Sequence, residues 1–131
     1  LEMAYCLYGH ELDDQTNPYE ANLGWVVKPQ VKDFVGRSLI VERKEHGLKH
    51  KLVGLKMVDK GIPRQGYKIY SPEGVECGFV SSGTHSPSLD HPIGLGYVAL
   101  AHSSENHEVS IDIRGRRAKA VVVKTPFIIK I

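Results

Sequence analysis

The sequence predicts a mainly β domain: a closed or nearly closed antiparallel barrel of roughly six strands, preceded by a helical segment at the N-terminus. Two observations support this prediction. From residue 52 onward, short segments alternate apolar and polar residues, the pattern of strands that bury one face. Short turns rich in glycine and proline join these segments, as in β-hairpins. Closure is expected because it removes the exposed edges of an open sheet.

Helical periodicity is confined to the first third of the chain. Within residues 1–8 the apolar residues repeat at helical spacing, and Gly9 follows at a position typical of a helix end. A second helix is predicted from Phe34 to about Glu45, with Asp33 as its cap and Gly47 near its end. Its inner face would carry Val35, Leu39 and Ile40.

The strands follow from the apolar pattern in the remaining two thirds. They are predicted over residues 52–57, 67–70, 75–80, 93–100, 109–113 and 118–123. The second and third should form a hairpin, since residues 71–74 place Pro and Gly where a type I turn favours them. Gly115 should turn the last two strands into another hairpin, and Pro126 should end regular structure.

Residues 81–89, called here the serine-rich stretch, separate two apolar runs and contain Ser, Gly and Pro. We predict a loop, because small side chains, the freedom of Gly83 and the fixed φ of Pro87 all suit a turn. Such a loop is either a tight structural corner, which we favour, or the lining of a site where something binds.

Composition restricts the class of protein. The length of 131 residues suits one domain, and a net charge of +2 does not require a nucleic-acid or membrane partner. No apolar run approaches the length of a membrane span. The only two cysteines, Cys6 and Cys77, are far apart, which favours a reducing compartment. Because the chain starts at Leu1 inside an apparent helix, we expect it to be a piece of a longer protein.

Reactive chemistry has little support in the sequence. His46 and His50 have the spacing of metal ligands, but the predicted helix ends between them, and His102 and His107 fall in a polar loop. We therefore predict mostly surface histidines and no metal site. No strand–helix elbow for a serine nucleophile is present, and Cys77 should point into the core. No catalytic residue is predicted.

Two further groups of side chains leave alternatives open. The basic residues near the last turn are Arg114, Arg116, Arg117 and Lys119, and a second basic patch is Lys49-His50-Lys51. They could contact RNA on a stand-alone barrel, but a solvated hairpin without neighbouring aromatics is the favoured interpretation. Trp25, Tyr5 and Tyr8 could stack on a planar ligand, although packing in the core or between domains is the more usual role.

Several short segments, in order along almost the whole chain, carry a family likeness. They are Leu7-Tyr8-Gly9, Pro18-Tyr19-Glu20-Ala21-Asn22-Leu23-Gly24-Trp25, Asp33-Phe34-Val35-Gly36-Arg37, Gly61-Ile62-Pro63-Arg64-Gln65-Gly66, Ser81-Ser82-Gly83-Thr84-His85-Ser86-Pro87-Ser88-Leu89 and Val123-Lys124-Thr125-Pro126-Phe127. As an ordered set they resemble the C-terminal part of aminomethyltransferase, the tetrahydrofolate-dependent T-protein of the glycine cleavage system.

The resemblance implies a C-terminal fragment with a Greek-key barrel. Residues 1–30 would be the end of the middle domain and the linker, and residues 31–131 the barrel domain. The complete enzyme takes the aminomethyl group carried by the lipoylated H-protein, releases ammonia and forms methylenetetrahydrofolate. Its partners would be that H-protein and the N-terminal domains of the same enzyme, without membrane or nucleic acid, in the bacterial cytoplasm or the mitochondrial matrix.

The resemblance also places the site. Tyr8 and Trp25 would form a possible edge of the folate pocket, whereas the reacting aspartate and a folate-binding arginine lie upstream of Leu1. The fragment should therefore be inactive by itself. The family often has an aromatic and a basic residue directly after the position of Phe127. At these positions this chain has Ile128 and Ile129, followed by Lys130. The barrel of a folate-dependent demethylase relative is an alternative.

Overall fold

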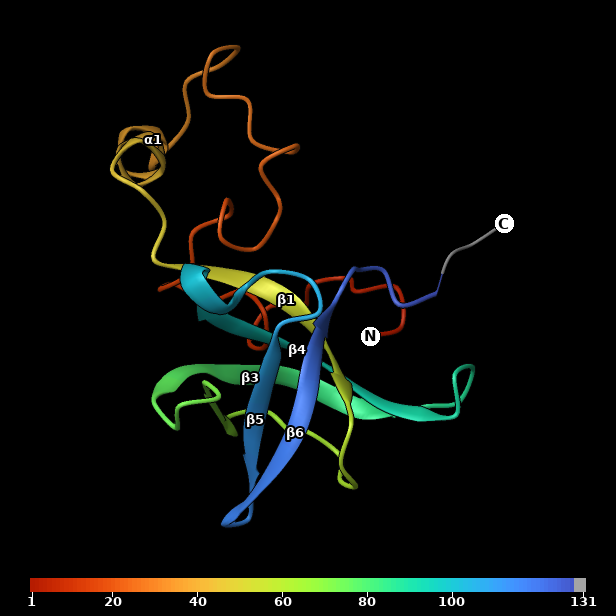
Figure 1. Ribbon diagram of the computed structural model, residues 1–131. Coiled ribbons are helices and arrows are strands. Elements are labelled where there is room, and N and C mark those ends of the chain that lie inside the picture. The colour runs from red at the N-terminus through yellow and green to blue at the C-terminus, as the bar shows by residue number, and fades with distance from the viewer. Residues whose placement is uncertain (129–131) are drawn as a thin grey trace.

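The computed structural model describes residues 1–128 and shows a closed antiparallel barrel of six strands (Figure 1). The elements in chain order are α1 (Arg37–Glu45), β1 (His50–Met57), β2 (Lys68–Tyr70), β3 (Glu76–Ser86), β4 (His91–Ala99), the short 3₁₀ helix η1 (Leu100–His102), β5 (Glu108–Ile113) and β6 (Arg116–Val123). Around the barrel the strands follow the order β1-β4-β3-β2-β5-β6, and β6 pairs again with β1. The predicted fold class is confirmed, as are the β2–β3 and β5–β6 hairpins.

Small and branched apolar side chains fill the barrel interior. The members of this buried cluster are Val53, Leu55, Met57, Ile69, Cys77, Val80, Val98, Val109, Ile111, Ala118, Ala120 and Val122. Each Val, Leu or Ile buried in this way stabilises the fold by roughly 1.5–3 kcal/mol relative to an exposed position. Cys77 lies among them, as its place in the strand pattern predicts.

Two glycines of β3 allow close approach of neighbouring backbone. A Cβ atom at Gly78 would lie 1.9 Å from the carbonyl oxygen of Tyr97, and one at Gly83 would lie 1.9 Å from that of Pro63. Real Cβ atoms do not approach oxygen so closely, so any side chain at these positions would force strand β3 away from its neighbours. The barrel depends on glycine here for space rather than for an unusual φ.

The loop predicted for the serine-rich stretch is wrong. Residues 81–86 continue β3 and pair with β4 as far as Ser86 opposite His91, so only residues 87–90 form the connection. The register shifts between Val80 and Ser82, where a β-bulge is placed. Composition was misleading because Ser81 and Ser86 are buried and find hydrogen-bond partners in the fold, which local sequence cannot show.

The helix predicted over residues 1–8 is also wrong. Residues 1–27, called here the N-terminal arm, form consecutive turns with a bridge between Tyr8 and Leu12. Of the residues that suggested a helix, Leu1 and Ala4 pack instead against an apolar cluster on the outer face of the barrel, whereas Tyr5 and Tyr8 are exposed. This second apolar cluster comprises buried Ala21, Leu52, Leu95 and Tyr97, with Leu1, Ala4, Cys6, Leu12, Leu23 and Phe127 packed against it. Tertiary packing has overridden the helical pattern.

Helix α1 lies where the second helix is predicted, but two details of that prediction are wrong. Its N-cap is Gly36, with φ of 85°, whereas the Asp33 carboxylate accepts a hydrogen bond from the N–H of Phe34. None of its nine residues is buried, and of the expected inner face Val35 and Leu39 are exposed while Ile40 is half-buried. Gly47, with φ of 90°, follows the helix end as predicted. In Figure 1 α1 lies apart from the strands.

Candidate functional site

A groove of about 500 Å³ lies between the N-terminal arm and the outer face of the barrel. We call it the aromatic groove; its lining includes Tyr5, Cys6, Ala21, Asn22, Trp25, Leu52, Leu95, Thr125 and Pro126. Buried Leu95, Leu52 and Ala21 are apolar lining residues of this groove. Tyr5 and Trp25 are 75% and 73% exposed as whole residues, so most of their surface is free to meet a ligand.

Backbone and amide hydrogen bonds hold the arm beside β1. The side-chain amide of Asn22 donates to the carbonyl oxygen of Leu52 at 2.8 Å, and the N–H of Leu52 donates to the carbonyl oxygen of Glu20 at 2.8 Å. Asn22 has a φ of 61°, a left-handed conformation that asparagine tolerates better than most residues. These bonds place Trp25, three residues later, at the groove.

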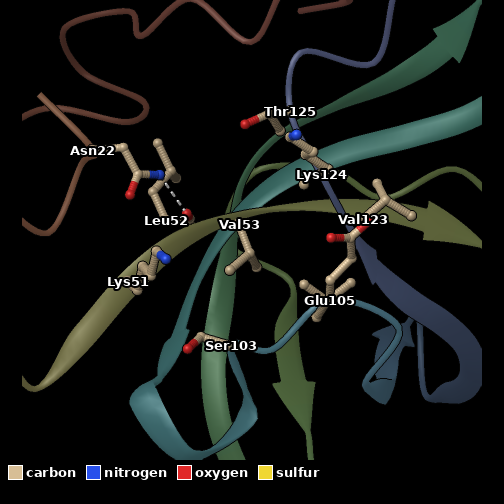
Figure 2. Close-up of a pocket in the computed structure, with 11 residues that line it drawn as sticks. Asn22, Lys51, Leu52, Val53, Ser103, Glu105, Val123, Lys124 and Thr125 are labelled. Carbon is tan, nitrogen blue, oxygen red and sulfur yellow. Dashed lines mark hydrogen bonds between the residues drawn. The ribbon is translucent and has the colours of Figure 1, made fainter.

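A second, more polar cavity of about 290 Å³ adjoins the aromatic groove (Figure 2). The residues that line both are Asn22, Leu52, Val53 and Thr125. Beyond them the polar cavity is lined by Lys51, Lys124, Ser103 and Glu105, which Figure 2 shows around the ends of β1 and β6. The two hollows together offer an apolar end edged by aromatic rings and a polar end with two lysines.

Two carboxylates of the N-terminal arm bind the serine-rich stretch. Glu11 is 1% exposed; it accepts hydrogen bonds from the Ser81 hydroxyl at 2.9 Å, from the Ser82 hydroxyl, and from the N–H of Leu7 at 3.0 Å. Glu2 accepts from the Ser86 hydroxyl and from the N–H and hydroxyl of Ser88. The serines therefore hold the N-terminal arm through hydrogen bonds to two carboxylates of the same chain.

These contacts shift the pKa of the groups involved. The Ser86 hydroxyl, followed by the N–H of Ser88, lowers the pKa of Glu2, because both bonds favour the charged form. Burial raises the pKa of Tyr97, whose hydroxyl donates to the carbonyl oxygen of Glu11 at 2.6 Å. Burial and then the Glu11 charge raise the pKa of the Cys6 thiol, so this groove residue is a poor nucleophile.

The two residues predicted to edge a folate pocket occupy different surroundings. Trp25 lines the aromatic groove, but among the described lining residues Tyr8 is not found. The Tyr8 hydroxyl donates to Asp14 at 2.8 Å, and this hydrogen bond raises its pKa. Both rings are exposed, as is Tyr5, so the interpretation of these aromatics as core residues of this chain is wrong. Their role toward folate stays a prediction.

Sequence reasoning missed several groove residues. Asn22, Leu95 and Thr125 come from the arm, from β4 and from the C-terminal side of β6, and only the closed barrel brings them together. Asn22 offered a local signal, since asparagine is common in turns and tolerates the left-handed conformation that it adopts here. Leu95 offered none, because nothing local distinguishes an outward apolar residue of a barrel from an inward one. Thr125 lies beyond the end of β6, and no local pattern there indicates that it meets the arm.

The basic hairpin is engaged in contacts within the fold. The Arg117 guanidinium lies 3.4 Å from the ring centre of Tyr70, the Arg116 guanidinium donates to the Lys60 carbonyl, and Lys119 is 3.9 Å from Glu108. An aromatic neighbour therefore exists, contrary to expectation, and it comes from β2. Because Arg117 covers that ring, stacking on an RNA base is disfavoured.

Residues 1–128 contain no group of three or more His, Cys, Asp or Glu side chains arranged to hold a metal ion. Within the same residues, no helix has the length and apolarity needed to cross a bilayer. The described side chains of the groove include apolar, amide, hydroxyl and aromatic groups. Fold and site thus define a β-barrel domain that carries a partly apolar surface groove beside its N-terminal arm.

Comparison with known proteins identifies the family. Residues 50–128 match the family model described as the glycine cleavage T-protein C-terminal barrel domain, and the chain belongs to this family. It is 59% identical to an aminomethyltransferase of Bdellovibrio bacteriovorus over 129 residues and 54% identical to one of Chloroherpeton thalassium over 130 residues. These alignments cover 98% and 99% of the chain but 36% of each relative.

A solved structure agrees with this assignment. The crystal structure of glycine cleavage system aminomethyltransferase T from Bartonella henselae superposes with a TM-score of 0.91 at 32% sequence identity. The match covers 97% of this chain and 36% of that one. The chain therefore spans about a third of the length of the relatives it matches.

Proposed function

We propose that this chain is the C-terminal barrel domain of a tetrahydrofolate-dependent aminomethyltransferase of the glycine cleavage system. The complete enzyme would transfer the aminomethyl group of a lipoylated carrier protein to tetrahydrofolate and release ammonia. The family assignment supports the enzyme class, and the aromatic groove is the observation that supports a part in folate binding. The curated relatives described above are aminomethyltransferases, which favours this function over a folate-dependent demethylase.

The groove suits a folate in shape and chemistry. The pyrimidine ring of the tetrahydropterin is planar and would lie against exposed aromatic faces, here those of Trp25 and Tyr5, over an apolar floor. Asn22 and Thr125 supply polar atoms in the lining of both the groove and the polar cavity, and Lys51 and Lys124 supply positive charge in the latter. When bound, the folate would supply the ring nitrogens that accept the one-carbon unit. We keep Tyr8 as a second edge of the site.

In the reaction, this chain would bind tetrahydrofolate and exclude water from it. The groove residues hold no reactive acid or activated nucleophile, since Cys6 is kept as a thiol. The reacting groups would come from the N-terminal domains of the same enzyme, and the substrate from the lipoylated H-protein. Both cysteines are free thiols, which suits a reducing compartment such as the bacterial cytoplasm or the mitochondrial matrix.

The test is an assay of the chain by itself. With aminomethyl-loaded lipoylated H-protein and tetrahydrofolate, the chain should form no methylenetetrahydrofolate, whereas the complete enzyme should turn over. Calorimetry should find folate binding weaker than the low micromolar range, about −8 kcal/mol, because only one wall of the site is present. Robust turnover by the chain alone would contradict the proposed division of labour.

A further inference from the structure

Two lysines line the polar cavity beside the aromatic groove. Lys51 belongs to β1 and Lys124 directly follows β6, and in Figure 2 they lie on either side of Val53. Both are exposed, and none of the described carboxylates forms an ion pair with either ammonium group. By contrast, Lys68 lies 3.4 Å from the Glu76 carboxylate. The charges of the two cavity lysines are therefore available to an anionic ligand.

The polar cavity also contains one acidic side chain. Glu105, in the loop between η1 and β5, is exposed and lines the cavity. Two lysines and one glutamate leave the lining with one net positive charge at neutral pH. The charge balance of the cavity therefore favours an anion. A ligand that engages both lysines at once needs two negative groups, because each ammonium group pairs with its own carboxylate.

The border between the groove and the cavity offers hydrogen-bond partners for an amide. Asn22 and Thr125 line both hollows. The side-chain N–H of Asn22 is already used, since it donates to the carbonyl oxygen of Leu52 at 2.8 Å. The Oδ1 atom of Asn22 and the Thr125 hydroxyl form no hydrogen bond with other described residues. An amide of a ligand that crosses this border can donate to the first and accept from the second.

We propose that Lys51 and Lys124 bind the two carboxylates of the glutamate tail of tetrahydrofolate and so determine specificity for that tail; this inference rests on the proposed folate function. Tetrahydrofolate consists of a ring system, then an amide, then a glutamate. The same order is found in the aromatic groove, its border and the two-lysine cavity. The opposite orientation would place both carboxylates over Leu95 and Ala21, where the desolvation of a charge is unfavourable.

Calorimetry on the complete enzyme compares tetrahydrofolate with its diamide, in which both tail carboxylates are replaced by carboxamides. The parent enzyme should bind tetrahydrofolate about tenfold more tightly, because two exposed ion pairs of about threefold each multiply. Lys51→Gln and Lys124→Gln should each raise the Kd of tetrahydrofolate about threefold and leave that of the diamide unchanged. Glu105→Gln removes a negative charge and should lower the Kd of tetrahydrofolate about twofold. Lys49→Gln is the matched control, since Lys49 lines neither hollow and its loss should change neither Kd.

The two ligands separate the failure of this inference from the failure of the proposed function. If the parent enzyme binds tetrahydrofolate and the diamide equally well, the lysines do not read the tail, and the folate function still stands. If the complete enzyme binds neither ligand, both proposals are wrong. Equal losses for the two ligands in Lys51→Gln and Lys124→Gln would indicate a structural role and would overturn the inference, as would the same loss in Lys49→Gln. The preference for tetrahydrofolate should also shrink at about 1 M salt, where charges are screened within about 3 Å.

Discussion

Replacing Glu11 by alanine should release the N-terminal arm from the barrel. The Glu11 carboxylate is almost fully buried and accepts hydrogen bonds from Ser81, Ser82 and Leu7. Hydrogen bonds to a charged acceptor are worth about 1.5–3 kcal/mol each. Removing the carboxylate leaves these donors without their partner.

The net cost is smaller than the sum of the three bonds. The Ser81 hydroxyl also lies 3.1 Å from the carbonyl oxygen of Leu95 and can turn to it. Ser82 and Glu11 line a cavity of about 380 Å³, so water can reach the freed hydroxyl. Burying the charged carboxylate costs desolvation free energy, which the alanine variant avoids, and this offsets a further part of the lost hydrogen-bond energy. We therefore expect a destabilisation of about 2–4 kcal/mol for Glu11→Ala.

Urea unfolding followed by two probes measures this effect. A loss of about 3 kcal/mol lowers the midpoint by roughly 1.5 M when the slope is about 2 kcal/mol per M. Trp25, the only tryptophan, reports on the arm, while far-UV circular dichroism reports on the barrel. In Glu11→Ala the fluorescence transition should precede the dichroism transition. The control Glu45→Ala removes an exposed carboxylate of α1 and should change stability by less than about 0.5 kcal/mol. Equal stability of Glu11→Ala and Glu45→Ala would refute the reasoning.

Three further outcomes are expected. Glu2→Gln should destabilise the chain above pH 4.5 and not in stronger acid. The pKa of Glu2 is lowered in the folded chain, so its carboxylate contributes stability that is lost as the pH falls; in acid, the urea midpoints of Glu2→Gln and of the parent chain should therefore converge. Gly78→Ala should cost about 3 kcal/mol or more through the clash with backbone, against about 1 kcal/mol for Gly115→Ala, which has open space but positive φ; equal losses in urea unfolding would contradict the close approach. Trp25→Ala should leave stability within about 0.5 kcal/mol and raise the folate Kd of the complete enzyme about tenfold, and an unchanged Kd would remove Trp25 from the site.

The division of the chain at residue 30 stays a prediction. The N-terminal arm does pack on the barrel through Ala21 and through the hydrogen bonds of Glu2 and Glu11, so it and the barrel share one apolar cluster. If the arm and the barrel were separate folding domains, the arm would have to be stable without its contacts to β3 and β4. The positions after Phe127, where this chain lacks the family's aromatic and basic pair, include residues 129–131, which lie outside the described part of the chain.

The sequence by itself determined the six strands in outline and the turns of the β2–β3 and β5–β6 hairpins. In strand β5, Val109, Ile111 and Ile113 alternate with polar residues. The pairing of β5 with β6 across Gly115 can be predicted from residues that are close together in the sequence. The closed barrel was predicted because closure pairs the backbone groups that the edge strands of an open sheet would leave exposed. The enzyme family also followed from ordered short segments of the sequence, and the comparisons confirmed it.

Only the tertiary structure decided which distant residues line the aromatic groove and which hydrogen bonds hold the N-terminal arm on the barrel. Glu11 and Ser81 are 70 positions apart, so their hydrogen bond leaves no local pattern, and the serines look like a loop until the buried carboxylate is known. The same holds for Arg117 on Tyr70, and for the groove that joins Trp25 to Leu95. Local periodicity reports which side of a strand is apolar, whereas long-range closure decides which distant side chains meet there.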